Sequence, residues 1–398
     1  MLKISEIFNA ASVLDGVARK TSIIPAPKLA DDCQLYLKTE NLQQTGSFKL
    51  RGAYYKISQL SEDERSRGVI ACSAGNHAQG VALGATHYGI KSLVCMPAGA
   101  PISKVEATKG YGAEVCLVPG VYDDAYARAL ELQKEHGYTF VHPFDDEKVI
   151  AGQGTIGLEI LEQLPDVEAV VIPIGGGGLI SGVAFAVKTL RPDVKVYGVQ
   201  AAGAPSMVES IAEGKICHLD SVSTIADGIA VKQPGEHTYE LCRDYVDGVV
   251  TVNDDETAAA ILALMEKQKV VAEGAGAVAV AAVMFHKLPV EGKKVVCLVS
   301  GGNIDVNTLN RVITRGLSKS GRNYTFIIDL FDKPGQLAGV MNVIASEGGN
   351  VISVTHERIN SSTEINGCTI RLELETRDAA HIDQIRKALD AAKFHVLN

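Results

Sequence analysis

The sequence has no excess of positive charge and no paired-cysteine motif, and these two absences exclude several classes of protein. Its 398 residues include 38 Lys and Arg against 47 Asp and Glu, a formal net charge of −9. A nucleic-acid binder needs a basic face, so this balance argues against a nucleic-acid partner. The eight cysteines are scattered without a C-x-x-C pair. That spacing argues against a zinc site or a disulfide framework and predicts buried thiols in a reducing cytoplasm.

A signal peptide and a continuous membrane span are also missing. The first residues, Met1–Glu6, do not resemble a signal peptide. Residues 169–187 contain no charged side chain, but Pro173 and four successive glycines, Gly175–Gly178, interrupt this stretch. Such residues are unusual in the middle of a membrane helix, so we expect a cytoplasmic protein with no membrane partner.

Short apolar runs alternate with helix-like segments over most of the chain, which is long enough for two or three domains. This alternation predicts parallel sheets with helices on both faces. The predicted strands are Val69–Cys72, Leu93–Met96, Val115–Val118, Ala169–Ile174, Val194–Val199 and Val295–Val299, and helices are predicted over His77–Tyr88, Ile102–Gly110, Asp123–His136 and Leu179–Leu190.

A lysine follows a Gly-Ser turn in the segment Thr45–Ala53. Ser47 is a candidate N-cap, and the apolar residues that follow have helical spacing. Lys49 would then lie in the first helical turn, where the positive end of the helix dipole disfavours an ammonium group. A partly deprotonated lysine is what Schiff-base chemistry requires, although most lysines in such positions are solvated surface groups.

A glycine run separates an apolar segment from a helix-like one at Gly175–Gly178. A strand, a glycine loop and a helix start together form a site for an anion, because backbone N–H groups converge there. The spacing G-x-G-x-x-G of a dinucleotide site fails at Ile180, and the next strand ends in Gln200 instead of an acidic residue. No Gly-Lys-Ser/Thr follows, so a P-loop is excluded and a phosphate monoester remains.

A third segment, Val295–Asp305, is a predicted buried strand that ends in Ser300 and two glycines. Ligands in open α/β sheets bind at this end of the strands, although Ser300 alone could equally be an N-cap. A lysine, a phosphate site and a serine at a strand end together suggest pyridoxal 5′-phosphate as the cofactor.

With these motifs the chain resembles the threonine dehydratase (threonine ammonia-lyase) family of fold-type II pyridoxal-phosphate enzymes. The matching pieces occur in the family's order: Ser47–Gly52, Ser73–Gly80, Gly175–Gly178 and Ser300–Asn303. The resemblance implies an α/β fold like that of the tryptophan synthase β subunit, with two parallel-sheet domains. It implies a catalytic part over residues 1–318, in which a smaller subdomain near 50–145 is inserted, and the cofactor in the cleft between them.

The resemblance also implies a role for each matching residue. Lys49 would form the Schiff base and act as base at the substrate α-carbon, Phe48 would pack on the cofactor or fill the core, and Ser300 would face the pyridine nitrogen. The phosphate would lie on Gly175, Gly176, Gly177, Gly178 and Leu179, and Asn76, Gly228 and Glu273 would also line the cofactor.

The loop Ser73, Ala74, Gly75, Asn76 and His77 would bind the substrate carboxylate. For His77 we favour a structural or carboxylate-binding role over that of a catalytic base. Related serine racemases have a serine where this chain has Ala74, which argues against racemase activity. Some relatives bind a cation through a glutamate where this chain has Gln200, so no metal is expected there.

The pattern changes after Asp305. A helix is predicted over Val306–Leu317, a linker over residues 319–323, and then the order βαββαβ of a ferredoxin-like domain. The predicted elements are Tyr324–Phe331, Gln336–Glu347, Val351–Ile359, Cys368–Leu374, Ala379–Ala391 and Phe394–Leu397. Residues 324–398 resemble an ACT domain, a small amino-acid-sensing module.

In such a module the backbone of Gly335, Gln336 and Leu337 would bind an amino-acid effector, and Asn350 could contact the effector's polar end. Such sites form where two ACT domains pair, which implies a homodimer or homotetramer. The alternative is a dimerisation module that senses nothing.

The expected reaction is the elimination of water from L-threonine, and also from L-serine, to give 2-oxobutyrate or pyruvate and ammonia. The alternatives are a serine dehydratase, or another β-elimination or β-replacement enzyme on the same scaffold. A protein of a different class, a non-catalytic amino-acid sensor, also remains open.

Overall fold

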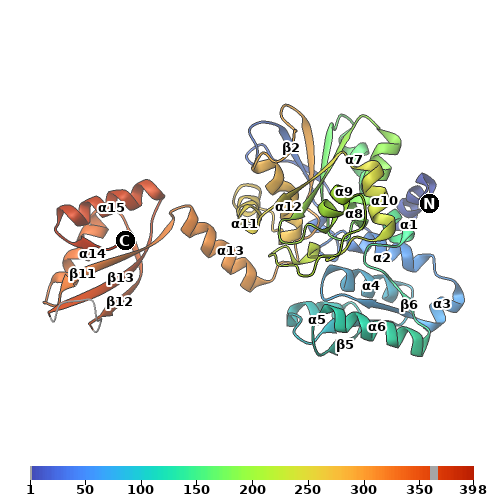
Figure 1. Cartoon of the computed structure of the whole chain (residues 1–398), viewed down its shortest axis with the longest axis horizontal. Helices are drawn as coiled ribbons and strands as arrows, with labels where there is room; N and C mark the ends of the chain where they lie inside the picture. Colours follow the sequence, from blue (N-terminus) through green and yellow to red (C-terminus); the bar gives the residue numbers. More distant parts are fainter. Residues whose placement is uncertain (1, 359–365) are drawn as a thin grey trace. The chain divides into compact units, whose positions relative to one another are not determined.

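The computed structural model describes residues 2–358 and 366–398. The chain divides into two compact units, Met1–Thr308 and Leu309–Asn398 (Figure 1). Each has its own sheet system and its own apolar core. The first unit has parallel sheets with helices, and the second has an antiparallel sheet, which confirms the predicted fold class.

The larger sheet of the first unit has the strand order β1-β2-β10-β7-β8-β9. All neighbouring strands in it are parallel except β1, which pairs antiparallel with β2. The strands are β1 (Ile23–Pro25), β2 (Gln34–Lys38), β7 (Ala169–Pro173), β8 (Lys195–Ala201), β9 (Gly248–Val252) and β10 (Lys294–Leu298).

The helices that follow these strands bury their apolar side chains against the sheet. One face of β7, including Val170 and Ile172, packs with Ile180 and Val183 of α8 in a single core cluster. The helices of this region are α1 (Ile4–Leu14), α7 (Glu147–Gln163), α8 (Gly178–Leu190), α9 (Ser206–Glu213), α10 (Glu236–Tyr245), α11 (Asp254–Ala263) and α12 (Gly274–Met284), with short turns η1 (Glu40–Leu42), η2 (Asp227–Ile229) and η3 (Leu264–Gln268).

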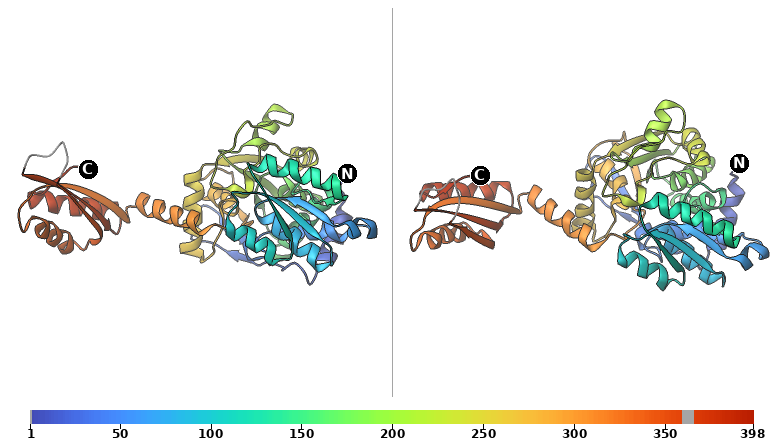
Figure 2. Two further views of the ribbon diagram at one scale, coloured as in Figure 1. Left: turned by 90° about the horizontal axis from the view of Figure 1, so that it is seen from below. Right: turned by 60° about the horizontal axis from the view of Figure 1, so that its bottom comes forward.

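The smaller sheet has the order β5-β4-β3-β6 and is parallel throughout. Its central strand β3 is covered on both faces: Val69 and Ala71 pack against α2 and α4, whereas Ile70 and Cys72 pack against α6. The elements are α2 (Lys49–Ser58), α3 (Glu62–Arg67), β3 (Val69–Cys72), α4 (Asn76–His87), β4 (Ser92–Pro97), α5 (Ile102–Gly110), β5 (Glu114–Val118), α6 (Tyr122–His136) and β6 (Thr139–Phe140) (Figure 2).

The strands and helices predicted in the first unit are confirmed, with ends that differ by one or two residues. The sequence did not predict β1, β2, β6 or β9. These strands are short or lie toward the edges of their sheets, where only part of each strand is buried, so their apolar pattern is weak.

The second unit has the predicted order βαββαβ. Its elements are β11 (Asn323–Phe331), α14 (Gln336–Ser346), β12 (Asn350–Glu357), β13 (Gly367–Glu375), α15 (Ala379–Ala391) and β14 (His395–Val396), and α13 (Val306–Lys319) precedes them. The sheet order β12-β13-β11-β14 is antiparallel, and its core includes Phe326, Ile370 and Ile385. The predicted end of the third element, Ile359, lies outside the described residues.

Over residues 2–358 and 366–398, no helix has both the length and the apolar character that crossing a bilayer requires.

Candidate active site

A cavity of about 1060 Å³ opens at the carboxyl ends of strands from both sheets of the first unit. Ser73 directly follows β3, and Gly175 and Ser300 follow β7 and β10 by two residues. The cavity brings together every residue that the sequence predicted for the cofactor and the substrate carboxylate: Phe48, Lys49, Ser73, Ala74, Gly75, Asn76, His77, Gly175, Gly176, Gly177, Gly178, Leu179, Gly228, Glu273 and Ser300.

Lys49 is the first residue of α2, and its ammonium group lies inside the cavity. The Nζ atom donates a hydrogen bond to the carbonyl oxygen of Pro143 at 2.7 Å. Burial lowers the pKa of Lys49 to about 8, against a smaller opposing effect of the nearby Glu273 carboxylate. The depressed lysine pKa was expected, but its main cause, burial, depends on tertiary structure.

The predicted N-cap of α2 is wrong. Phe48, not Ser47, occupies the N-cap position, and the hydroxyl of the buried Ser47 has no hydrogen-bond partner. The reason is that the chain before α2 pairs with the segment after β10: Ser47 forms a bridge with Gly301, and Phe48 N–H donates to Ser300 O at 3.1 Å. This pairing, rather than a cap, positions Lys49 next to Ser300.

Cofactor attachment should depend on pH in the way the Lys49 pKa dictates. Below about pH 8 the amine is mostly protonated, and above it the neutral nucleophile predominates. We therefore expect the rate at which Lys49 of cofactor-free enzyme forms its bond to pyridoxal 5′-phosphate to rise with pH and to level off above about pH 8. A stopped-flow absorbance series tests this. A rate that keeps rising to pH 10, as an ordinary lysine would give, contradicts it.

The glycine run Gly175–Gly178 forms one wall of the cavity, and α8 begins at Gly178. The first N–H groups of a helix have no partner within the helix, so they are free to bind an anion. Gly177 has φ of +98°, which favours glycine, and a Cβ atom on Gly176 would lie 2.5 Å from the Phe144 ring. Side chains larger than glycine would therefore collide with Phe144, and the loop fits a phosphate group approached by backbone alone.

The loop opposite the glycine run, His142–Asp146, was missed by sequence reasoning. Asp145 accepts hydrogen bonds from Glu236 N–H at 3.0 Å and His237 N–H at 3.1 Å at the start of α10. Thr238 in turn donates to Gly176 O at 2.6 Å. The loop follows β6, a strand of two residues that gives little apolar pattern, so its position at a strand end could not be read from the sequence.

Three amide and carboxyl side chains form a hydrogen-bonded series at the cavity wall. Asn76 Nδ2 donates to Glu273 Oε1 at 2.7 Å, and Asn303 Nδ2 donates both to Asn76 Oδ1 at 2.7 Å and to Thr45 O at 2.8 Å. This series fixes which way the Asn76 amide faces. Asn303 belongs to the Ser300–Asn303 motif, but sequence reasoning gave it no role.

Glu273 is buried between Asn76 and the cavity. Burial and the nearby Asp227 raise the pKa of Glu273 to about 7, despite opposing effects of Lys104, Asn76 and Lys49. Ser300 is also buried, and its hydroxyl donates to Ala275 O at 3.3 Å. That distance is at the long end for a hydroxyl donor, so the Ser300 hydroxyl can turn toward a ligand.

The loop before α4 presents a helix start to the cavity, as predicted for carboxylate binding. Gly75 occupies the N-cap, and its N–H donates to the Ser73 hydroxyl at 3.2 Å. His77 Nε2 donates to Val141 O at 2.8 Å, and burial lowers the pKa of His77 to about 3. A neutral ring tied to the backbone fits the structural role that we favoured.

Gly228 and Phe48 line the cavity and also have neighbours outside it, whereas Gln200 is not part of the cavity lining. Gly228 lies beside Asp227, which forms an ion pair with Lys104 of the smaller subdomain at 2.7 Å across the cavity. Phe48 lies against the large core cluster while also lining the cavity. Gln200 is buried, and its Oε1 accepts from Met207 N–H at 2.9 Å, so this side chain caps α9.

The residues predicted for an effector do not meet within one copy of the second unit. Gly335 is the N-cap of α14 at the end of β11, with Gln336 and Leu337 in the first turn. Asn350 begins β12, which runs parallel to β11, and donates to Glu375 Oε2 at 3.0 Å. The two positions are therefore at opposite ends of the sheet, roughly 25 Å apart for an eight-residue strand.

Two family models match this chain. Residues 14–301 match the pyridoxal-phosphate dependent enzymes, and residues 320–393 match the ACT domain. The first match includes the cavity residues from Phe48 to Ser300.

Curated relatives match with high identity. An L-threonine ammonia-lyase of Thermotoga maritima is 51% identical over 398 residues, which are 100% of this chain and 99% of the relative. An L-threonine ammonia-lyase of Geobacter sulfurreducens is 45% identical over the same length. The catabolic L-threonine dehydratase TdcB of Escherichia coli is 46% identical over 313 residues, 78% of this chain and 95% of the relative.

Solved structures match about four fifths of the chain. The processed form of threonine deaminase isoform 2 from Solanum lycopersicum has a TM-score of 0.73 at 40% identity, covering 78% of this chain and 88% of that structure. The maize serine racemase has a TM-score of 0.75 at 35% identity, with 80% and 98% covered.

Proposed function

Because the chain belongs to the pyridoxal-phosphate dependent enzymes and to the L-threonine ammonia-lyase family within them, we propose that it converts L-threonine to 2-oxobutyrate and ammonia. The observation that carries the proposal is one cavity in which a buried lysine of lowered pKa faces a glycine phosphate site and Ser300. L-Serine, which differs by one methyl group, would react in the same way to give pyruvate.

Different residues of the cavity would bind different groups of the cofactor and the substrate. The backbone of Gly175–Leu179 would hold the phosphate of the cofactor, Asn76 its ring hydroxyl, and Ser300 its ring nitrogen. The start of α4, from Ser73 to His77, would hold the substrate carboxylate. Pyridoxal 5′-phosphate, when bound, supplies the electron sink that makes the α-proton of the substrate acidic.

Lys49 would carry the proton transfer. Its amine would lie beside the substrate α-carbon and would remove the α-proton. The hydroxyl on the β-carbon would take up a proton as its bond to carbon breaks and would leave as water, so that the α-hydrogen and the hydroxyl together account for the water lost. The enamine product takes up one water molecule again on release, which gives 2-oxobutyrate and ammonia. The Ser300 hydroxyl would tolerate an uncharged ring nitrogen, which would favour elimination over transamination.

The substrate assay separates the candidate activities. The holoenzyme is incubated with L-threonine and L-serine, and kcat/KM for 2-oxobutyrate and pyruvate is compared. A higher kcat/KM for serine would identify the protein as a serine dehydratase. Formation of D-serine would instead support a racemase, the activity named for the similar maize structure, although Ala74 argues against it. A non-catalytic sensor would turn over neither substrate and would lack a cofactor absorbance band that borohydride removes.

Substituting Ser300→Asp should slow elimination by at least about tenfold, or roughly 1.4 kcal/mol of barrier. A carboxylate at this buried position would favour a protonated ring nitrogen and change the electron sink. The measurement is kcat for threonine together with the absorbance spectrum of the enzyme during turnover. Ser300→Ala, which removes the hydroxyl without adding charge, is the matched control, and an unchanged rate and spectrum in Ser300→Asp would show that Ser300 does not face the ring.

We also propose that residues 324–398 regulate the catalytic part, residues 1–318, through the linker 319–323. The ACT match and the helix start that Gly335 forms after β11 support amino-acid binding. Gly335 and Asn350 lie at opposite ends of one domain, so a shared effector would require a second copy, and a homodimer or homotetramer follows. Eight free cysteines fit a reducing, cytoplasmic location.

Millimolar isoleucine or valine should change threonine turnover of the full-length protein, with a coupling of about 1–3 kcal/mol. Both are compared with serine and with no addition. The control is a shortened chain that ends before residue 320. The E. coli relative, 95% of which matches 313 residues of this chain, has about that length. If no amino acid changes the kinetics of the full chain and the shortened chain behaves identically, the regulatory role is wrong.

A further inference from the structure

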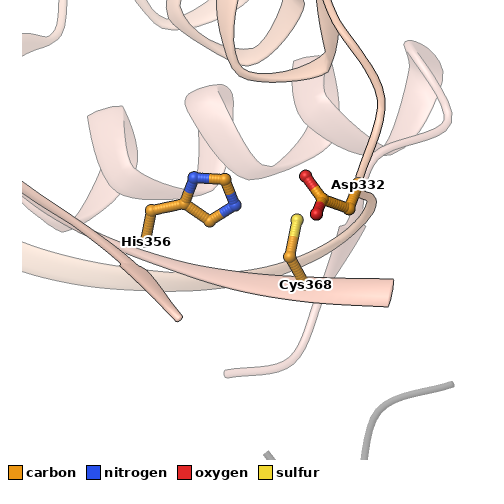
Figure 3. A group of neighbouring side chains, drawn as sticks. All are labelled: Asp332, His356 and Cys368. Atoms are coloured by element: carbon orange, nitrogen blue, oxygen red, sulfur yellow. The ribbon is translucent and has the colours of Figure 1, made fainter. Parts of the chain in front are cut away.

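A thiol, an imidazole and a carboxylate converge at one end of the ACT sheet. Asp332 follows β11, His356 is near the end of β12, and Cys368 is near the start of β13. Their ligand atoms all lie within 4.8 Å of one another. Figure 3 shows the Cys368 sulfur between the His356 ring and the Asp332 carboxylate. We propose that these three side chains form a binding site for a zinc-class divalent ion.

The strand register explains why the three side chains share one face. Cys368 is opposite Leu330 on β11, and Asp332 is two residues beyond Leu330. On the other side of β13, His356 is opposite Ile370, two residues beyond Cys368. Side chains two residues apart on a strand, and those directly opposite on neighbouring strands, point to the same face. Regular pairing therefore delivers one donor from each of three chain segments.

The donor set selects the kind of ion. Thiolate and imidazole suit zinc and related transition metals, whereas calcium and magnesium prefer oxygen ligands. Metal–ligand bonds of roughly 2.0–2.3 Å in a tetrahedral site place the ligand atoms roughly 3.3–3.8 Å apart. The three ligand atoms lie within 4.8 Å of one another, so side-chain rotations that move them by about 1 Å would complete the site. Asp332 and His356 are exposed, which leaves room for water as the fourth ligand.

An ion bound to Asp332 would have to displace the side chain of Arg358, which forms an ion pair with that carboxylate. Arg358 Nε lies 3.1 Å from Asp332 Oδ2, but the Arg358 side chain is 68% exposed and can swing into solvent. Metal binding would exchange the proton of the Cys368 thiol for an S–metal bond, with no change in oxidation state.

The site would tie the start of the β11–α14 loop to two neighbouring strands. Asp332 is three residues before Gly335, whose N–H lies at the start of α14. An ion held by β12, β13 and this loop would restrict the loop that we propose for effector binding. The ion site itself rests only on its three ligands and stands independently of that proposal.

Zinc retention by the full-length holoenzyme tests the site. The protein is equilibrated with one equivalent of ZnCl₂ under reducing conditions and desalted, and zinc per chain is measured by elemental mass spectrometry. We expect about one retained zinc per chain in the wild type, and an at least roughly tenfold lower zinc content in His356→Ala and in Cys368→Ser. The matched controls are His395→Ala, an exposed histidine of the same unit, and Cys33→Ser in the first unit, and both should retain zinc.

The exposed His356 keeps the test decisive even if Cys368→Ser, a change in the core, fails to fold. Absence of retained zinc in the wild-type chain overturns the proposal. Retention that His356→Ala leaves unchanged also overturns it, because the ion would then be bound elsewhere. Loss of threonine turnover in Lys49→Ala has no bearing on zinc retention, so failure of the catalytic proposal and failure of this one are distinguishable.

Discussion

Replacing Lys49 with alanine should reduce 2-oxobutyrate release from L-threonine by about a thousandfold or more, while the protein remains folded. We propose that this amine both holds the cofactor covalently and acts as the base, so its loss would remove chemistry and not packing. The lowered pKa of Lys49 and its hydrogen bond to Pro143 O inside the cavity support this role.

The measurement is the rate of oxoacid formation at saturating threonine, with circular dichroism to confirm folding. Lys56→Ala, on the same helix, is the matched control: its ammonium group pairs with Asp146 at the partly exposed surface and should be nearly dispensable. Turnover of Lys49→Ala within tenfold of wild type would reject the assignment.

Replacing Arg51 with methionine should destabilise the first unit by about 3–5 kcal/mol. Arg51 is only 1% exposed and donates to Glu40 at 2.8 Å and to Glu159 at 2.6 Å. Burial would raise the pKa of Glu40, but the charge and hydrogen bonds of Arg51 outweigh it and hold that pKa below its usual value. Without Arg51, Glu40 would become a buried carboxylate without its main partner.

Denaturant unfolding followed by fluorescence or circular dichroism measures this loss. Arg67→Met, which breaks the exposed pair between Arg67 and Asp63, is the control and should cost less than about 1 kcal/mol. The double variant Arg51→Met/Glu40→Gln should recover part of the loss, because it removes the uncompensated charge. An equal effect of Arg51→Met and Arg67→Met would show that the buried network is not important for stability.

The Arg51 network also has a consequence for the site. Arg51 is two residues after Lys49 on α2, while Glu40 precedes that helix and Glu159 lies on α7. The ion pairs therefore hold α2 in place against the larger part of the first unit. We expect small losses of stability here to lower activity as well, because the position of Lys49 depends on α2.

The sequence predicted the elements whose pattern is local. Strands such as β3, β7 and β10 are short apolar runs, and the helices after them have helical spacing, so burial on two faces fixes both patterns in the chain itself. The βαββαβ order of the second unit was also visible locally, because strands such as β13 alternate apolar and polar residues, as half-buried strands do. The sequence also showed the run of glycines that includes Gly176, where the structure leaves no room for a side chain beside Phe144.

Only the tertiary structure decided how these pieces act on one another. The lowered pKa of Lys49 and the raised pKa of Glu273 come from burial by segments far away in the chain. The pairing of Ser47 with Gly301 overrode the expected N-cap, because a bridge to a distant segment competes with a local hydrogen bond.

The Asn76–Asn303 series and the Asp332–His356–Cys368 group are decided in the same way. Their members are far apart in the chain, and the register of the strands and the meeting of distant segments bring them together only in the folded protein. The sequence by itself therefore determined the fold class and the cofactor, and it predicted residues that line one cavity. Burial, register and long-range pairing, which depend on the folded chain, decided the ionisation of those residues and their partners.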